Sequence, residues 1–353
     1  MTKIEILASG HINRADSAFP TLVRLDNGDI ICGFSVGGGP SASGGTDWAR
    51  STDGGQTWTW EGTILPRTEN PVTTNSLRLS RTREGTVIAY GQRNYPSEEK
   101  GEWGTGKNEP IFCLSSDNGR TWSSPHVIHS DRKGPFEISN PVVVLADGRW
   151  LAPAAVLGDP KRLGEYVIAF ESSDKGRTWP STRTVLKDPE GLKGFFEQKL
   201  IELEPDMLLA VAWTVSLGDY KDFENHFAIS KDGGRTWSPP RSTGIRGQTM
   251  TPLWLGDDRL LVVYNRRYGR QGVVICLVRF TETRWEVEWE HMLWDAKKSR
   301  QRGEDVESGI DEMSHFEFGL PSVLRLDEKS FLAVHWCKEE GIFGIRWTKL
   351  RLD

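Results

Sequence analysis

The chain is poor in the residues that usually mark a metal centre or a disulfide framework. It has only four cysteines and seven histidines in 353 residues. The cysteines are isolated and lie in predicted strands, which favours buried thiols over disulfides; they are Cys32, Cys113, Cys276 and Cys337. The histidines show no metal-ligand spacing. We therefore expect no metal and no other cofactor.

Long apolar runs and a strong excess of one charge are also missing. The chain contains no run of about 18 apolar residues, which is the length needed to span a bilayer. Its first five residues lack the apolar core of a secretion signal. The formal net charge of -5 is mild for this length and gives no reason to expect nucleic acid or a membrane as a partner. We expect a cytoplasmic protein with a single domain over residues 1–353, because no linker or low-complexity stretch divides the chain. The sequence leaves the oligomeric state open.

An octet of the form Ser-x-Asp-x-Gly-x-Thr-Trp occurs four times. The copies begin at Ser51, Ser115, Ser172 and Ser230. Ser and Asp side chains can bond nearby backbone N–H groups, and Gly at the fifth position allows a turn that a Cβ would resist. Each octet is therefore interpreted as a hairpin turn, and its closing Trp as a residue that packs between sheets.

A second repeat has six copies and interleaves with the octets. Each copy is an apolar run, a short turn and a second apolar run, which is typical of a β-hairpin; the copies span 19–34, 75–90, 140–155, 197–212, 251–264 and 320–334. Each unit is then two inner strands followed by an outer hairpin, although unit five keeps only a decayed outer hairpin at 279–285. The pattern predicts an all-β fold, a six-bladed β-propeller. We expect the segment 3–8 to close the ring as the outermost strand of the last blade.

The octets resemble the Asp-box, or BNR, repeats of the sialidase superfamily, and with the six hairpins the likeness covers essentially the whole chain. Sialidases as a family bind the substrate carboxylate with three arginines, use an Asp acid/base in the first blade, and attack with a Tyr assisted by a Glu. The resemblance implies that Glu197 is the fourth-blade Glu and that Asp47 is the first-blade Asp. It also implies that Arg266 or Arg267 is the third arginine.

Three family positions carry other residues. Ala18 and Trp213 stand where the first and second arginines are expected, and Phe318-Gly-Leu replaces the segment that follows the nucleophilic Tyr. Sialic acid cleavage by the usual mechanism is therefore not expected. The resemblance instead implies a carbohydrate-active protein, an exo-acting glycoside hydrolase that removes another terminal sugar.

Independently of the family, several charged side chains are expected at one end of the ring axis. Glycoside hydrolysis needs two carboxylates on a rigid frame, and Glu197 is the first choice because Phe195 and Phe196 precede it and burial would raise its pKa. The catalytic candidates are Glu197, Asp47, Glu317 and His315, with Glu312 as a further axial carboxylate. The substrate-binding candidates are Arg93, Arg266, Arg267, Glu137, Trp103 and Asp16.

Two other functions fit the same residues. A polysaccharide lyase would use Tyr95, Tyr220 or His315 as its base and arginines to neutralise a uronate carboxylate. A sugar-binding propeller without activity would explain the missing arginines and Tyr. In all three cases the expected partner is a carbohydrate, either an oligosaccharide or a glycoside.

Overall fold

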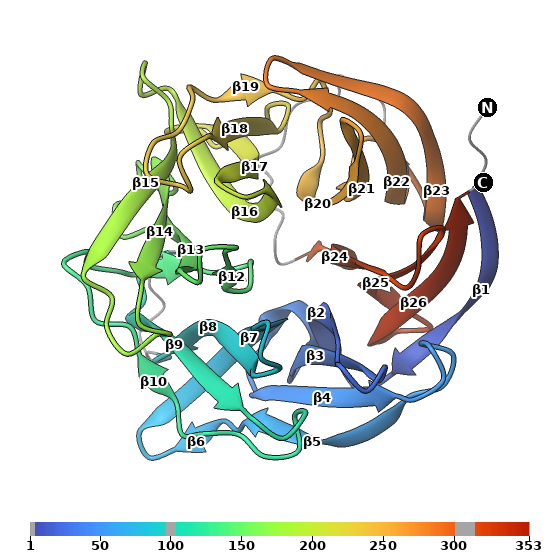
Figure 1. The fold of residues 1–353 in the computed structure, drawn as a ribbon. Coiled ribbons are helices and arrows are strands. Elements are labelled where there is room, and N and C mark those ends of the chain that lie inside the picture. Colours follow the sequence, from blue (N-terminus) through green and yellow to red (C-terminus); the bar gives the residue numbers. More distant parts are fainter. Residues whose placement is uncertain (1–3, 97–103, 301–314, 353) are drawn as a thin grey trace.

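The computed structural model describes residues 4–96, 104–300 and 315–352, which form a ring of six antiparallel sheets (Figure 1). Each sheet is one blade, and its strands follow one another from the axis outward. Antiparallel neighbours need only short connections, which is why consecutive units of the sequence make consecutive blades. The predicted six-bladed β-propeller is confirmed.

The strand bounds follow the six units. Blade 1 contains β2 (Ser17–Arg24), β3 (Ile30–Val36), β4 (Thr46–Ser51) and β5 (Thr59–Leu65), with the short helix η1 (Gly39–Ser41) between β3 and β4. Blade 2 contains β7 (Val72–Arg81), β8 (Val87–Asn94), β9 (Asn108–Ser115) and β10 (His126–Val127), and β6 (Thr68–Glu69) pairs with β7. Blade 3 contains β11 (Phe136–Glu137), β12 (Val143–Val144), β13 (Trp150–Val156), β14 (Tyr166–Ser172) and β15 (Ser181–Lys187).

The second half of the ring is built in the same way. Blade 4 contains β16 (Lys193–Glu204), β17 (Met207–Ser216), β18 (His226–Ser230) and β19 (Arg241–Ser242). Blade 5 contains β20 (Gln248–Gly256), β21 (Arg259–Arg266), β22 (Gly269–Thr281) and β23 (Arg284–Arg300). Blade 6 contains β24 (Phe318–Arg325), β25 (Ser330–Glu339) and β26 (Ile342–Leu352).

The N-terminal strand closes the ring, as expected. Strand β1 (Ile4–Asn13) pairs antiparallel with β26, with Ile4 opposite Leu352. It is the outermost strand of blade 6, beside the C-terminal strand (Figure 1). This pairing joins the two ends of the chain in one sheet and covers an edge of β26 that would otherwise expose unpaired backbone groups.

The outer hairpin of blade 5 differs from the prediction. It has lost the octet, but its strands are not decayed: β22 has 13 residues and β23 has 17. A tight turn at Glu282–Thr283 replaces the octet, and the charged stretch 295–300 continues β23. An outer strand pairs through its backbone and can carry many polar side chains. The polar composition of 284–300 therefore led to a prediction that was too short for β23.

The hydrophobic core lies in the seams between neighbouring blades. Six buried clusters are found, one for each seam; for example, Leu145 of blade 3 and Phe196 of blade 4 belong to one of them. The octet tryptophans pack at these seams, and Trp179 is 5% exposed. The four cysteines are free and buried in the same layers, as predicted. Burial raises the pKa of Cys113 to about 12, so this thiol stays protonated at neutral pH.

Each octet is a turn held together by its own Ser and Asp. In the first copy, Gly55 N donates to Ser51 Oγ (2.8 Å), and Thr57 donates from both N (2.9 Å) and Oγ1 (2.6 Å) to Asp53. Gly55 has φ 89°, and a Cβ there would lie 2.6 Å from a side-chain carbon of Leu332. These contacts explain why the residue types repeat so strictly.

The octets predict acid sensitivity. Hydrogen bonds from Thr121, through its side chain and then its backbone, lower the pKa of Asp117 to about 2. This stabilisation is therefore complete above the unfolded pKa of about 3.9 and is lost as the pH falls through the folded pKa. We expect Asp117→Asn to reduce the free energy of unfolding by about 1 kcal/mol at pH 7 and by much less at pH 2.

Urea unfolding at both pH values measures this effect. Asp131→Asn is the control, because Asp131 is exposed and its carboxylate accepts one long hydrogen bond among the described residues, from Thr182 Oγ1 at 3.4 Å. An equal loss for Asp117→Asn at the two pH values would contradict the explanation.

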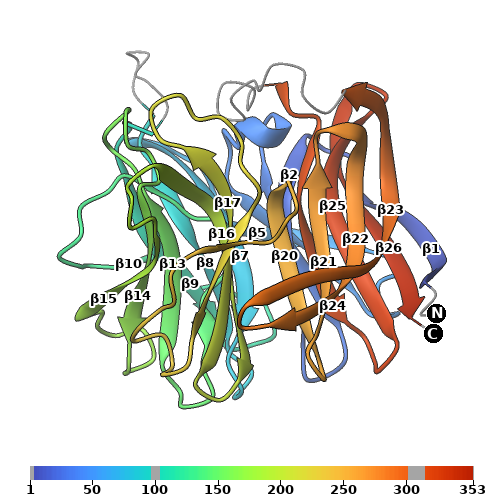
Figure 2. The ribbon, with the colours of Figure 1, turned by 90° about the horizontal axis from the view of Figure 1, so that it is seen from above.

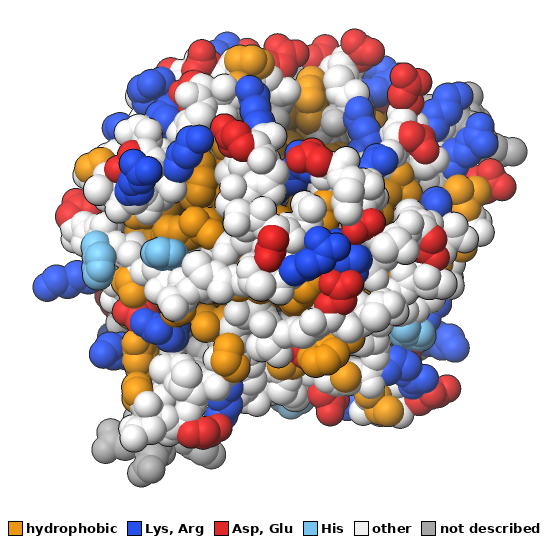
Figure 3. Space-filling view, turned by 60° about the horizontal axis from the view of Figure 1, so that its bottom comes forward, with side chains coloured by type: hydrophobic (Ala, Val, Ile, Leu, Met, Phe, Trp, Pro, Cys, Tyr) orange, Lys and Arg blue, Asp and Glu red, His pale blue; other side chains and the backbone are white. Residues whose placement is uncertain are grey.

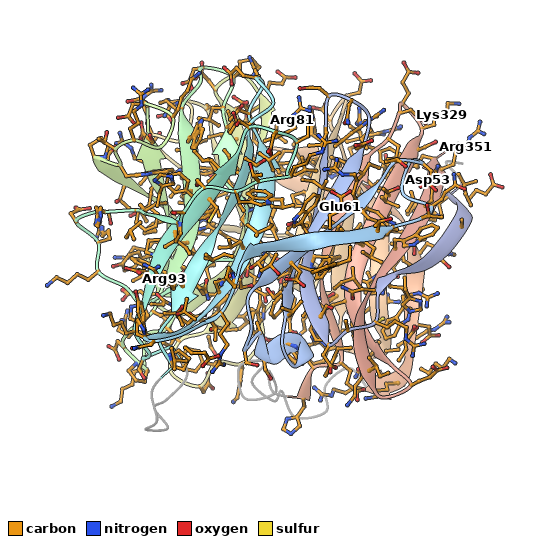
Figure 4. All side chains as sticks on the ribbon, turned by 90° about the horizontal axis from the view of Figure 1, so that it is seen from below. Asp53, Glu61, Arg81, Arg93, Lys329 and Arg351 are labelled. Atoms are coloured by element: carbon orange, nitrogen blue, oxygen red, sulfur yellow. The ribbon has the colours of Figure 1, made fainter. Side chains whose placement is uncertain are left out.

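The two rims of the ring carry different elements. The octets and the turns inside the hairpins lie at one rim, where Asp53, Arg81 and Lys329 are labelled, and Arg93 lies at the other (Figure 4). Helix η1 is at the rim of Arg93 and lies at the upper rim in Figure 2. The starts of the inner strands therefore lie at the η1 rim. No helix in the described part of the chain is long and apolar enough to cross a membrane.

Candidate active site at the ring axis

Four of the innermost strands share a bulge close to their start. The register shifts near the start of each of β2, β16, β20 and β24. At each shift one residue other than Gly has a positive φ: Phe19 (59°), Glu197 (48°), Thr249 (41°) and Leu320 (39°). Such a conformation costs energy for a residue with a Cβ and re-aims the side chain, and both bulges and backbone strain are common beside active sites. Glu197 is the one carboxylate among the four.

Glu197 contacts a second carboxylate from the neighbouring blade. Its backbone N donates to Glu137 Oε2 at 2.9 Å, and Ser139 Oγ donates to Glu137 Oε1. Lys199, two residues after Glu197, donates from Nζ to the carbonyl oxygen of Ser139. The bulged start of β16 is thus joined to residues 137–139 of blade 3 by two hydrogen bonds, and the bond from Ser139 to Glu137 holds the acceptor side in place. We call Glu137, Glu197, Lys199, Arg78 and Arg267 the axial cluster.

Burial and charge change the proton affinities in this cluster. Burial, and then the negative charge of Glu137, raises the pKa of Glu197 to about 7. The positive charges of Lys199, Arg267 and Arg78 act against this rise. Burial, and then the charge of Arg78, lowers the pKa of Lys199. Glu197 is therefore able to exist as a neutral acid near pH 7, which is the state that a proton donor needs.

Arg78 is an axial residue that the sequence analysis missed. It lies on β7, is 3% exposed, and stacks over the ring of Phe19 at 5.2 Å. Its Nη1 donates to Ser76 Oγ at 2.7 Å, whereas its Nε has no hydrogen-bond partner among the described residues. The sequence feature that could have revealed Arg78 is its charge, because it stands in the run Ser76 to Leu79, where apolar and polar residues alternate. Lys199 was missed for the same reason, because both were read as members of inner strands.

Arg267 approaches the cluster from blade 5. Its guanidinium group stacks over Phe316 at 3.6 Å, and its Nε donates to Gln248 Oε1. Gln248 in turn donates to the buried Asp222 at 3.4 Å, and Trp213 Nε1 donates to the same carboxylate at 2.7 Å. This network fixes the orientation of Arg267. It also shows that Trp213 is a packing residue, 2% exposed.

A cavity of about 300 Å³ lies beside Arg267. Its wall includes two other predicted residues, His315 and Glu317. Glu317 accepts a hydrogen bond from Lys298, so its carboxylate is already paired with a cation. The structure thus brings Arg267, His315 and Glu317 together in one cavity, and Arg267 is the residue that this cavity shares with the axial cluster.

Asp47 is not part of the axial cluster. Its carboxylate accepts hydrogen bonds from Trp60 Nε1 (2.9 Å) and Thr63 Oγ1 (2.7 Å), both on the outermost strand of blade 1. Asp47 lies on β4, the third strand from the axis, and its carboxylate is bonded to side chains of the next strand outward, β5. The role implied for it by the resemblance is therefore not supported by its place in the fold.

The remaining candidates lie at other places. Arg266 pairs with Glu290 on β23 at 2.8 Å and lines a separate cavity of about 490 Å³. Arg93 pairs with Glu109 in blade 2. Asp16 is exposed at the η1 rim, where its carbonyl oxygen accepts from Gly39 N at 2.9 Å. Trp103 and Glu312 lie outside the described residues.

The two phenols considered as lyase bases have structural partners. Tyr95 OH donates to Glu109, and burial with this bond raises the pKa of Tyr95. Tyr220 OH donates to the carbonyl oxygen of Pro160 and accepts from Leu163 N at 2.9 Å. Within the described ranges, no group of three His, Cys, Asp or Glu side chains is arranged to hold a metal ion.

Solved structures show the same fold. A protein of unknown function from Dyadobacter fermentans matches with a TM-score of 0.76 at 20% identity, covering 99% of both chains. The Penicillium chrysogenum α-L-arabinanase complexed with arabinobiose matches with a TM-score of 0.67 at 13% identity, covering 98% of both chains. The Trypanosoma rangeli sialidase matches with a TM-score of 0.61 at 13% identity, over 95% of this chain and 55% of that one. At these identities the likeness concerns the fold alone.

Sequence comparison indicates the family. A sialidase of Bacteroides fragilis is 26% identical over 259 residues, which are 67% of this chain and 45% of the relative. The chain thus spans less than half of that protein in the alignment. The family model of the BNR repeat-like domain matches residues 46–331. This chain therefore belongs to the BNR repeat-like domain family, within the sialidase superfamily.

Proposed function

We propose that this protein is an exo-acting glycoside hydrolase in which Glu197 and Glu137 are the two catalytic carboxylates. The observation that carries the proposal is their contact at the axis, Glu197 N to Glu137 Oε2 at 2.9 Å, together with the raised pKa of Glu197. The names of the relatives, a sialidase and an arabinanase, agree with hydrolysis of a terminal sugar.

The two carboxyl groups have different roles in this proposal. Glu197, protonated near neutral pH, gives its proton to the glycosidic oxygen as the bond to the leaving group breaks. Glu137 accepts hydrogen bonds from Glu197 N and Ser139 Oγ, which hold its carboxylate still. From that position it stabilises the positive charge that develops on the sugar ring, until a water molecule adds to the anomeric carbon and returns a proton to Glu197.

The cationic residues of the axial cluster would bind the oxygens of the sugar. Arg78 and Arg267 are buried, and the positive charges of the cluster outnumber its two carboxylates. A sugar that carries a carboxylate, such as a uronic acid, suits this balance. Sialic acid suits it less, because Ala18 and the buried Trp213 occupy the positions of two family arginines.

Release of product from a panel of aryl glycosides and oligosaccharides tests the proposal. The panel includes arabinosides, uronides and the sialic acid derivative, and both wild type and Glu197→Gln are assayed. We expect hydrolysis of at least one neutral or uronic acid glycoside and none of the sialoside. Absence of hydrolysis across the panel would contradict the proposal.

A uronate lyase is the second candidate, because His315 and Arg267 line the same cavity. In that reaction His315 would remove a proton beside the uronate carboxylate, and Arg267 would neutralise its charge. An unsaturated product, seen as a rise in ultraviolet absorbance on a uronate polysaccharide, would favour the lyase over the hydrolase.

A further inference from the structure

Trp60 is an unusually exposed tryptophan. It lies on β5 and is 61% exposed, whereas the octet residue Trp179 and the packing residue Trp213 are buried. Strand β5 is the outermost strand of blade 1, on the perimeter of the ring (Figure 1). Figure 3, in which this side of the ring comes forward, shows hydrophobic side chains scattered among charged and other polar groups. A large ring kept in water has an energetic cost, and exposed aromatic surface is often a binding site.

The indole of Trp60 is held by hydrogen bonds rather than left free. Its Nε1 donates to Asp47 Oδ2 at 2.9 Å, and Thr63 Oγ1 donates to Asp47 Oδ1 at 2.7 Å. Asp47 and Thr63 are directly opposite each other in the pairing of β4 with β5. The ring is therefore oriented before any ligand arrives, which reduces the entropy lost on binding.

Asp47 has hydrogen-bonding capacity left over. An ionised carboxylate has about four acceptor sites, and two donors are bound to this one. No cation among the described residues forms an ion pair with Asp47, whereas its neighbour Glu61 pairs with Arg50 at 2.9 Å. Glu61 is labelled on this strand in Figure 4. A ligand at this place must therefore offer hydroxyl donors beside an apolar face.

We propose that Trp60, Asp47 and Thr63 form a second carbohydrate-binding surface, separate from the axial cluster, for neutral sugar units of a polysaccharide. The C–H face of a pyranose or furanose ring packs on the indole, and its hydroxyl groups donate to Asp47. An acidic sugar is excluded because its charge would face the carboxylate of Asp47. The site binds without catalysis, so it does not depend on the proposed hydrolase activity.

Affinity electrophoresis tests this surface. The full chain carrying Glu197→Gln, which prevents digestion of the gel, is run through arabinan, galactan, xylan and polygalacturonate. We expect retardation by at least one neutral polysaccharide and a dissociation constant on the order of tenfold weaker after Trp60→Ala. Leu192→Ala is the matched control, because Leu192 is also 61% exposed and has no ring.

Two results would overturn the inference. One is the absence of retardation in every neutral polysaccharide, and the other is unchanged retardation after Trp60→Ala. Melting curves confirm that the variants are folded, and Trp60→Phe should restore part of the affinity. In a background with Glu197 intact, Trp60→Ala should leave hydrolysis of small aryl glycosides unchanged, which separates this surface from the active site.

Discussion

Glu197→Gln should lower kcat by about a thousandfold on whichever glycoside the wild type hydrolyses. The amide keeps the shape of the side chain but has no proton to give to the leaving oxygen. The bond from the backbone N of residue 197 to Glu137 does not involve the side chain, so the site should keep its geometry. Steady-state kinetics should therefore show a loss in kcat with little change in KM.

The matched control for this variant is Glu204→Gln. Glu204 is the exposed last residue of the same strand, β16, and its substitution should leave kcat unchanged. If Glu197→Gln retains more than about a tenth of the wild-type kcat, Glu197 is not the proton donor. The loss in kcat should be larger for a glycoside with a poor leaving group than for an activated aryl glycoside, because departure of the poor leaving group depends more on protonation.

Lys199→Met should shift the pH dependence of the reaction toward higher pH. The positive charge of Lys199 lowers the pKa of Glu197, so its removal allows that pKa to rise. Glu197 acts in its protonated form, and activity therefore falls as the pH rises through its pKa. We expect this alkaline limb of kcat/KM to move up by about one pH unit.

The direction of the shift distinguishes this explanation from simple structural damage. Damage to the site would lower activity at every pH without moving the limb. Lys193→Met is the control, because Lys193 lies at the start of the same strand but pairs with Asp188 at 3.4 Å. A limb that stays in place, or moves to lower pH, in Lys199→Met would mean that Lys199 does not tune Glu197.

The blades and their order could be predicted from the sequence because the contacts that form them are local. The octet is closed by bonds that reach only two to four residues along the chain, as between Ser51, Asp53 and Thr57. The inner hairpins pair adjacent apolar runs with alternating side chains, which two-residue periodicity reveals. Closure by the N-terminal strand followed from counting strands, since the last unit supplied only three. The length of β23 was not predictable in this way, because its outer residues are polar and no octet marks its turn.

The candidate site was predicted in part. Glu197 was singled out from its apolar neighbours, and in the structure its backbone N contacts the carboxylate of Glu137 of blade 3, 60 residues earlier, and not that of Asp47. The catalytic roles of these residues stay predictions. Asp47 shows why sequence alone could not place this side chain. A position near the end of a loop does not determine which neighbouring strand the side chain contacts. The hydrogen bonds to Trp60 and Thr63 determine it.

The sequence alone determined that this chain is a ring of repeated four-strand units, because turn chemistry and alternation act between residues that are close in the chain. Only the tertiary structure decided which charges meet at the axis, where Arg78, Glu137, Glu197 and Arg267 come from four different blades. Ring closure brings these inner strands together, and a left-handed backbone conformation at Glu197 sets the direction of its side chain. Neither effect leaves a local pattern in the sequence, because each depends on contacts between units that are far apart in the chain.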